Sequence, residues 1–371
     1  MERVQPLTSP KTASPATPGM GPLTLVLQPM PIAGGAAGGR VGELPWQALV
    51  GCESLKDAVP ATLRVDAGTA EPLLIPCVVS PGRRSWRLRV SLEPTPIPTW
   101  PACGVSPREL VAAVARAGTS ARVDHLDWML PTWAAKEVME DLDGLELPAH
   151  ATLNGYETWV IPLQSDYEAV HKTFKGNTRR EIRYARERGV TVVAEPTRDQ
   201  LLQFARLWRS CYQERGWEGP FYSEQFFLAA PRYLGAGGKM VLAEADGRVV
   251  AGALFVDEGP GAFHYMGAMD RAYKDHFAMM GIFDHALRAL CAEGKEYLNL
   301  GGVGASQDLA VFKQKWGAEA RMIPVLRCSR ELSPLPAPLR AANAAVRRGV
   351  SSFFRIYRGR YQRALARELQ P

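Results

Sequence analysis

The sequence predicts an α/β fold of the α+β type, with mixed but mostly antiparallel sheets divided between two domains. Short runs rich in Val, Ile and Leu alternate with longer segments of helical periodicity along most of the chain. Asp246 and Gly247 separate two of these runs, and Asp-Gly between strands is a strong hairpin signal. The 371 residues are enough for two domains of ordinary size.

Residues 1–22, rich in Pro, Ser and Thr, are expected to form a disordered tail. Residues 23–150 are expected to form the N-terminal domain. Ser106 and Pro107 mark a helix start, because Ser caps free amides and Pro fits the first helical position. The glycine-rich run at 34–42 is predicted to be a loop, since no Lys-Ser or Lys-Thr pair follows it. Strands are predicted at 23–28, 61–65, 73–79, 86–92 and 123–129, and helices at 107–117 and 133–142.

Residues 151–330 are expected to form the second domain. Ser165 is the expected cap of its first helix, and Gly189 ends the second. Strands are predicted at 156–163, 191–195, 239–244, 249–257, 262–268 and 297–300. Helices are predicted at 165–174, 174–190, 198–214, 223–234, 277–293 and 307–316.

Residues 331–371 are expected to form a Pro-rich linker and an Arg-rich amphipathic helix. This segment holds eight Arg and two Glu, a balance of +6 that equals the net charge of the whole chain. Residues 1–330 are therefore neutral overall. Three uses are open for the helix: packing on the domain with a charged outer face, binding a polyanion such as tRNA, or contacting an anionic membrane surface.

Several classes of protein are disfavoured by composition. The six Cys stand singly and the six His form no pair at helical spacing, so we expect neither a disulfide scaffold nor a structural metal. No apolar run reaches the length needed to cross a bilayer, and no signal-peptide core is present. A cytoplasmic protein is the expectation.

The strand, glycine turn and helix at residues 297–318 are where chemistry is expected. Gly301, Gly302 and Gly304 allow the backbone to approach another molecule closely. Leu309, Phe312 and Trp316 share one helix face, with Lys313 and Lys315 beside it. The alternative is an ordinary strand-to-helix connection with a packed face and solvated lysines.

A strongly basic helix is predicted some 120 residues earlier. This segment contains six cationic residues but only two acidic ones, Glu181 and Glu187. Pairing at i,i+4 with two glutamates cannot neutralise six positive charges. The alternative for such a run is a solvated helix face. The cations are Lys175, Arg179, Arg180, Arg183, Arg186 and Arg188.

The two segments together resemble the Fem family of aminoacyl transferases and their FemAB-like relatives in the GNAT acyltransferase superfamily. The first carries Asn-Thr-Arg-Arg-Glu-Ile-Arg-Tyr-Ala at 177–185, and the second carries Leu-Gly-Gly at 300–302 and Phe-Lys-Gln-Lys-Trp-Gly-Ala at 312–318. The resemblance covers roughly residues 155–330. It implies tandem GNAT-like domains, the first degenerate, and an enzyme that moves an acyl or aminoacyl group onto an amine.

The resemblance also implies roles for particular residues. Phe312 and Lys313 match a pair that lies beside the tRNA acceptor end and the reacting ester, so they are the expected catalytic residues. The strands at 262–268 and 297–300 are expected to part and admit the acyl donor, and His264 and Tyr265 point to opposite faces of the first. Asp284, His285 and Glu319 are candidate general bases, although the reaction does not require one. Donor or substrate contacts are expected from Arg179, Arg180, Arg183, Lys175, His264, Tyr265, Asn299, Gly301, Gly302 and Lys315.

The donor is left open by the sequence. Acetyl-CoA enzymes of the superfamily carry a Gln/Arg-x-x-Gly-x-Gly/Ala loop that grips pyrophosphate at a helix start, and residues 271–281 lack that glycine pattern. Aminoacyl-tRNA is therefore slightly preferred over acyl-CoA as co-substrate, with no tightly bound cofactor. The acceptor is expected to be a small-molecule or peptide amine. Another class of function is a non-catalytic GNAT-like module that binds RNA or a membrane.

Overall fold

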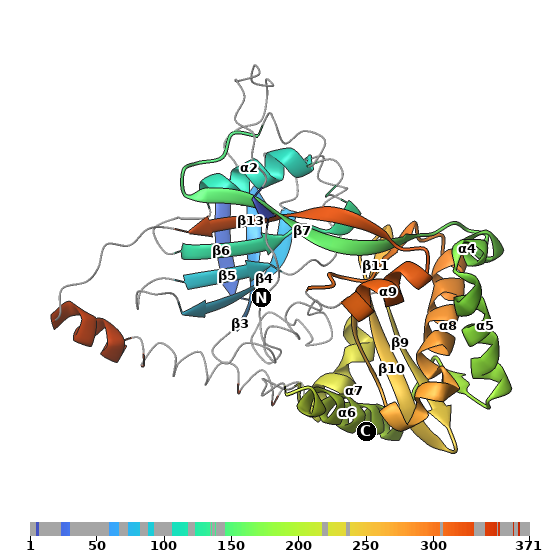
Figure 1. Cartoon of the computed structure of the whole chain (residues 1–371). Coiled ribbons are helices and arrows are strands. Elements are labelled where there is room, and N and C mark those ends of the chain that lie inside the picture. The colour runs from blue at the N-terminus through green and yellow to red at the C-terminus, as the bar shows by residue number, and fades with distance from the viewer. Residues whose placement is uncertain are drawn as a thin grey trace. The chain divides into compact units, whose positions relative to one another are not determined.

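The structure is a computed structural model, and its elements fall into two compact units. Unit 1 comprises Met1–Arg3 and Glu157–Met322, and unit 2 comprises Val4–Tyr156 and Ile323–Pro371. Figure 1 shows the elements of both. The residues described are 5–6, 24–29, 59–66, 73–81, 88–92, 106–117, 123–133, 135, 138, 145–216, 222–234, 238–304, 307–329, 338–346, 348, 359 and 363.

Unit 2 is built on a mostly antiparallel sheet. Its strands lie in the order β2-β3-β4-β5-β6-β13-β7, and the β5–β6 pair is parallel. Helix α2 (Pro107–Ala117) begins as the sequence predicts, because Ser106 and Glu109 each hydrogen-bond the backbone amide of the other. The strands are β2 (Thr24–Pro29), β3 (Val59–Asp66), β4 (Leu73–Pro81), β5 (Leu88–Leu92), β6 (Val123–Met129), β7 (Ala151–Pro162) and β13 (Glu319–Ser329).

Unit 1 contains the second sheet segment and most of the helices. Its strands follow the order β7-β12-β11-β10-β9-β8, with β7 contributing its C-terminal half. They are β8 (Thr191–Val193), β9 (Lys239–Ala245), β10 (Arg248–Asp257), β11 (Gly261–Met269) and β12 (Tyr297–Asn299). At the β9–β10 hairpin Asp246 and Gly247 both take positive φ (50° and 73°), as a two-residue turn of this kind requires.

Helices cover both faces of the unit 1 sheet (Figure 1). On one face, the ring of Phe204 from α6 lies directly against Gly252 of β10. On the other, Phe283 of α8 contacts Phe255 of β10, with ring centroids 5.6 Å apart. The helices are α4 (Tyr167–Thr173), α5 (Gly176–Glu187), α6 (Arg198–Glu214), α7 (Glu224–Tyr233), α8 (Ala278–Ala292) and α9 (Gln307–Lys315).

Most predicted elements are confirmed to within five residues at each end, but two details of the prediction are wrong. Asp166, not Ser165, caps α4 by accepting from the amide of Glu168. The chain then straightens at Phe174 and Lys175 before α5 starts, because the Phe174 ring packs in the core 5.1 Å from the ring of Trp316. Gly189 takes φ of 72° just after α5, as expected for its role in ending that helix.

Strand β13 was not expected at all. Its first three residues are exposed, and the buried positions that follow do not alternate regularly, so the usual period of two is missing. Its partner β6 lies about 200 residues away in the sequence, with Arg327 opposite Asp127.

Some expectations fall mainly outside the described residues. The run at 34–42 does, as does all of 1–22 except β1 (Gln5–Pro6), which pairs with β7. Of the predicted helix at 133–142, residues 133, 135 and 138 are described and are helical. In the tail, residues 338–346 are helical and expose Leu339 and Val346. None of the helices in the described ranges is both long and apolar enough to traverse a bilayer.

Candidate active site at the parted strands of unit 1

Strands β11 and β12 pair for only three residues and then part. The parallel register joins Gly261 to Tyr297, Ala262 to Leu298 and Phe263 to Asn299. Beyond Phe263, β11 continues to Met269, whereas the chain after Asn299 turns away toward α9. We call the region between these diverging ends, after Phe263 and after Asn299, the strand gap. It lies where the sequence predicted parted strands.

The turn after β12 is held by Asn299. Its side-chain oxygen accepts hydrogen bonds from the Thr158 hydroxyl (2.5 Å) and from the Gly301 amide (2.7 Å). Gly301 adopts φ of 74°, and a Cβ there would lie 3.5 Å from the Phe263 ring. Glycine is therefore favoured at this position for its backbone conformation.

Lys313 is buried at the strand gap. Its side chain extends from α9, is 3% exposed, and donates to the carbonyl oxygens of Gly301 and Gly302, both at 2.6 Å. Burying an ammonium group is costly unless dipoles or charges compensate, and these two carbonyls supply that compensation. The sequence alternative of a solvated lysine is thus wrong for Lys313. The positive charge lies where the two strands separate.

His264 is the first residue of β11 beyond the paired stretch. Its ring centroid lies 5.4 Å from that of Phe255 and 5.0 Å from that of Phe283. Its Nε2 atom is buried and has no hydrogen-bond partner in the described part of the chain. Burial, and then the charge of Lys313, lower the pKa of His264 to about 3. The imidazole is therefore neutral at physiological pH.

Tyr265 lies on the opposite face of β11 from His264, as the alternation of a strand predicts. Its hydroxyl lies 2.5 Å from that of Tyr222, next to the start of α7. Phe312 is half-buried against Phe283, at 5.6 Å between ring centroids. Part of its ring thus belongs to the core of unit 1.

The structure brings the two cationic segments together at the ends of α5 and α9. The Lys175 amide and the Thr178 hydroxyl both donate to the Lys315 carbonyl oxygen at 3.0 Å. The Lys315 ammonium contacts both carboxylate oxygens of Glu181, at 3.0 and 2.9 Å. Lys315 therefore ties α9 to α5. Arg179, Arg180 and Arg183 are exposed on α5.

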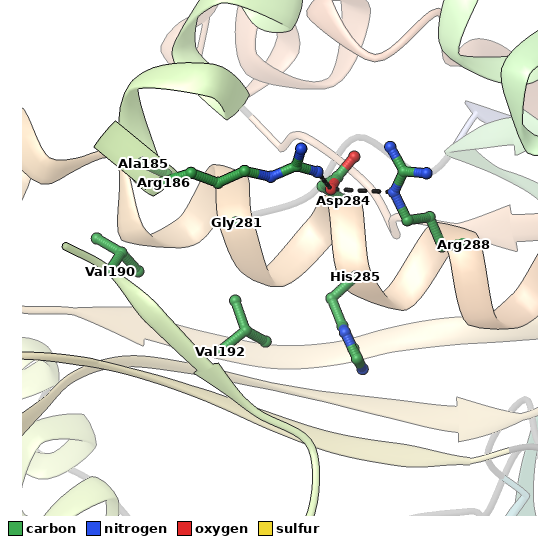
Figure 2. A pocket seen from close by; sticks show the side chains of 8 residues that line it. All are labelled: Ala185, Arg186, Val190, Val192, Gly281, Asp284, His285 and Arg288. Atoms are coloured by element: carbon green, nitrogen blue, oxygen red, sulfur yellow. Dashed lines mark hydrogen bonds and ion pairs between the residues drawn. The ribbon is translucent and has the colours of Figure 1, made fainter. Parts of the chain in front are cut away.

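A pocket between α5, β8 and α8 contains two of the three candidate bases (Figure 2). Asp284 is buried and accepts from the Tyr167 hydroxyl, from Arg186 (2.7 Å) and from Arg288 (3.2 Å). Burial raises its pKa, but these bonds outweigh burial and leave the pKa below its usual value.

The other two candidate bases have different surroundings. Burial and the charge of Lys239 lower the pKa of His285, which lines the same pocket. Glu319 is exposed and lies 3.9 Å from Arg321. Sequence reasoning missed the network around Asp284, although the i,i+4 spacing of Asp284 and Arg288 was visible. The third partner, Arg186, is 98 residues away and gave no local signal.

Comparison with known proteins places this unit in a superfamily. Residues 172–314 match the family model described as an acetyltransferase (GNAT) domain. This part of the chain is therefore a GNAT domain. No curated protein sequence matches the chain.

Among solved structures, the fold resembles that of FemX. The two share 12% sequence identity with a TM-score of 0.58, over 81% of this chain and 96% of the FemX chain. At this level of identity the likeness to FemX is one of fold. Weaker matches include the C-terminal domain of a putative lysylphosphatidylglycerol synthetase from Agrobacterium fabrum (14% identity, 73% of this chain and 85% of that one, TM-score 0.44). A tandem GNAT protein from the clavulanic acid pathway matches at 12% identity (84% and 100%, TM-score 0.40).

Proposed function

We propose that the protein is an acyltransferase that forms an amide at the strand gap, taking an aminoacyl group from tRNA and passing it to a small-molecule or peptide amine. The observation that carries this proposal is the buried ammonium of Lys313 at the point where β11 and β12 diverge. Transfer of an activated acyl group needs little beyond alignment of the amine and stabilisation of a negative oxygen.

In the proposed reaction, the acceptor nitrogen attacks the carbonyl carbon of the aminoacyl ester. A C–N bond forms, the C–O bond to the ribose breaks, and the proton lost by the amine passes to the departing oxygen. The charge of Lys313 offsets the negative charge on the tetrahedral intermediate. Neutral His264 offers its buried Nε2 for a hydrogen bond to a reacting group in the same gap.

The start of α8 supports tRNA over acyl-CoA as the donor. This helix start is where CoA-dependent GNAT enzymes bind pyrophosphate through backbone amides. Here Phe277 stands at the helix N-cap with φ of 55°, and its ring lies 6.0 Å from that of Tyr184. The Arg188 guanidinium lies over the Phe277 ring, 5.2 Å from its centroid. Bulky side chains thus gather where glycines would expose the amides.

Lys313→Met tests the catalytic role, because it keeps most of the volume and removes the charge. Purified protein is given labelled aminoacyl-tRNA with a panel of primary amines and a lysine-containing peptide, and labelled amide is measured. We expect a loss of at least about 100-fold, the size found when one oxyanion-stabilising donor is removed. Lys274→Ala, an exposed lysine on the segment before α8, is the control and is expected to retain full activity.

The same assay with acetyl-CoA separates the donors. Amide formed from acetyl-CoA alone would show that the donor assignment is wrong. No product from either donor, together with intact RNA binding, would identify a non-catalytic module. Melting curves with each donor give an independent measurement, since only a bound donor raises Tm.

A further inference from the structure

The surface of α4 and α5 carries a large excess of positive charge. Residues 164–190 contain seven Lys and Arg against four Asp and Glu. All seven cations are exposed. Of the acids, Glu181 is engaged by Lys315, and Glu187 lies 3.2 Å from Arg183. We call the seven cations the basic face: Lys172, Lys175, Arg179, Arg180, Arg183, Arg186 and Arg188.

Four of these cations form a stripe along one flank of α5. The helix buries Thr178, Ile182 and Ala185. Helical spacing therefore places Arg179, Arg183 and Arg186 together on one side of that buried line, and Lys175 precedes them at the N-cap. At 1.5 Å per residue the stripe is about 16 Å long. Its first member donates its backbone amide to Lys315, so the stripe begins beside the helix that carries Lys313.

The other end of the stripe opens on the pocket in Figure 2, a cavity of about 190 Å³. Arg186 from α5 and Arg288 from α8 converge there on the same oxygen of Asp284. The Tyr167 ring fixes the Arg288 guanidinium at 3.9 Å. Both arginine side chains remain substantially exposed, at 63% and 43%. Arg288 also lies 3.5 Å from the exposed carboxylate of Glu168. Two partly exposed guanidinium groups, both oriented by the buried carboxylate of Asp284, therefore lie at the pocket mouth.

We infer that an RNA backbone runs along this stripe and that one of its phosphates occupies the pocket mouth between Arg186 and Arg288. Planar guanidinium forks match phosphate oxygens in geometry as well as charge. The inference rests on the proposed function, because the stripe starts at the contact of α5 with α9, the helix that carries Lys313.

An anionic membrane is the rival partner for a basic surface. Membrane-binding surfaces pair cations with exposed apolar side chains that enter the lipid. Among the described residues, the exposed large hydrophobic side chains are Leu309 and Val311 on α9 and Leu339 and Val346 in the tail. None of them belongs to α4, α5 or α8, which carry the basic face and the pocket. A concave site for a single anion at the end of a linear stripe favours a phosphate chain.

The test is fluorescence anisotropy of labelled, deacylated tRNA over a range of salt concentrations. Arg179→Ala is expected to weaken binding and to lower the slope of log affinity against log salt by about 1. Arg186→Lys keeps the charge but loses the fork, so affinity is expected to fall about tenfold with the slope unchanged. Arg206→Ala removes an exposed arginine of α6 paired only weakly with Glu224, and is expected to bind as the unaltered chain does.

Equal losses for Arg206→Ala and Arg179→Ala would overturn the inference, because binding would then be diffuse. It would also be overturned if Arg186→Lys bound RNA normally, or if the variants lost binding only to phosphatidylglycerol vesicles. Deacylated tRNA cannot donate, so this outcome is independent of amide formation. If the variants transfer the aminoacyl group normally and bind RNA as the unaltered chain does, the stripe is not the RNA site, but the proposed function stands. If RNA binds at the stripe but no amide is formed, the proposed function is wrong, but the RNA site stands.

Discussion

The side chain of Lys313 and the imidazole of His264 meet at the strand gap, where burial, and then the charge of Lys313, lower the pKa of His264. Lys313 donates to two carbonyl oxygens, whereas no acidic residue in the described part of the chain raises the pKa of His264. A second positive charge at the strand gap would meet both desolvation and repulsion. The folded protein therefore holds the His264 ring neutral.

This arrangement makes stability depend on pH. In the unfolded chain His264 takes up a proton near pH 6.5, but in the folded chain it does so only near pH 3. The folded state consequently loses stability as the pH falls below 6.5. Between pH 7 and pH 5 this one group is expected to cost about 2 kcal/mol.

Urea unfolding at pH 7 and pH 5 measures that loss. His264→Gln, which cannot titrate, should lose less stability than the unaltered chain over the same interval. An identical loss in both proteins would mean that His264 is not held neutral in the folded state.

At the scale of elements, two glycines lie where helices pack on the unit 1 sheet, and they differ in the room left for a side chain. A Cβ at Gly252 of β10 would lie 2.5 Å from the Phe204 ring, so α6 packs against bare backbone. A Cβ at Gly281 of α8 would lie 3.4 Å from Val192, an ordinary contact. The first glycine is required by packing and the second is not.

The substitutions Gly252→Ala and Gly281→Ala should therefore have opposite effects on the free energy of unfolding. The first overpacks the α6 interface and is expected to destabilise by about 1–3 kcal/mol. The second improves helix propensity without a clash and is expected to stabilise by up to about 1 kcal/mol. Chemical denaturation at pH 7 compares them, and a destabilised Gly281→Ala variant would contradict the packing described for α5 and β8.

Local signals predicted elements where a short segment contains all the information. The Asp246-Gly247 turn, the Ser106 cap and the positive φ of Gly189 are of this kind. Strand β13 and the break before α5 depend on partners far along the chain, β6 and Trp316. Neither partner can be recognised from the segment itself.

At the scale of the whole molecule, the net charge of +6 equals the balance of residues 331–371. Removing those residues leaves a chain that is neutral overall, with the basic face of α4 and α5 intact. Long-range attraction to polyanions depends on net charge and is screened by salt, whereas contacts at a local cationic surface persist.

Deletion of residues 331–371 is therefore expected to slow association with tRNA at low ionic strength and to have little effect near 0.15 M salt, where the Debye length is about 8 Å. Stopped-flow binding at two salt concentrations measures this. A large loss of affinity at the higher concentration would show that the tail contacts RNA directly.

By itself, the sequence determined the α+β class, nearly all helices and strands of unit 1, and the two cationic segments, because periodicity, caps and turns are local. Only the tertiary structure decided what each cation does. Lys313 is buried against two carbonyls, Lys315 is paired with Glu181, and Arg186 joins Arg288 on Asp284. The partners Arg186 and Asp284 are 98 residues apart in the sequence, and Glu181 and Lys315 are 134 apart. Such contacts depend on how the elements pack, so no local sequence pattern predicts them.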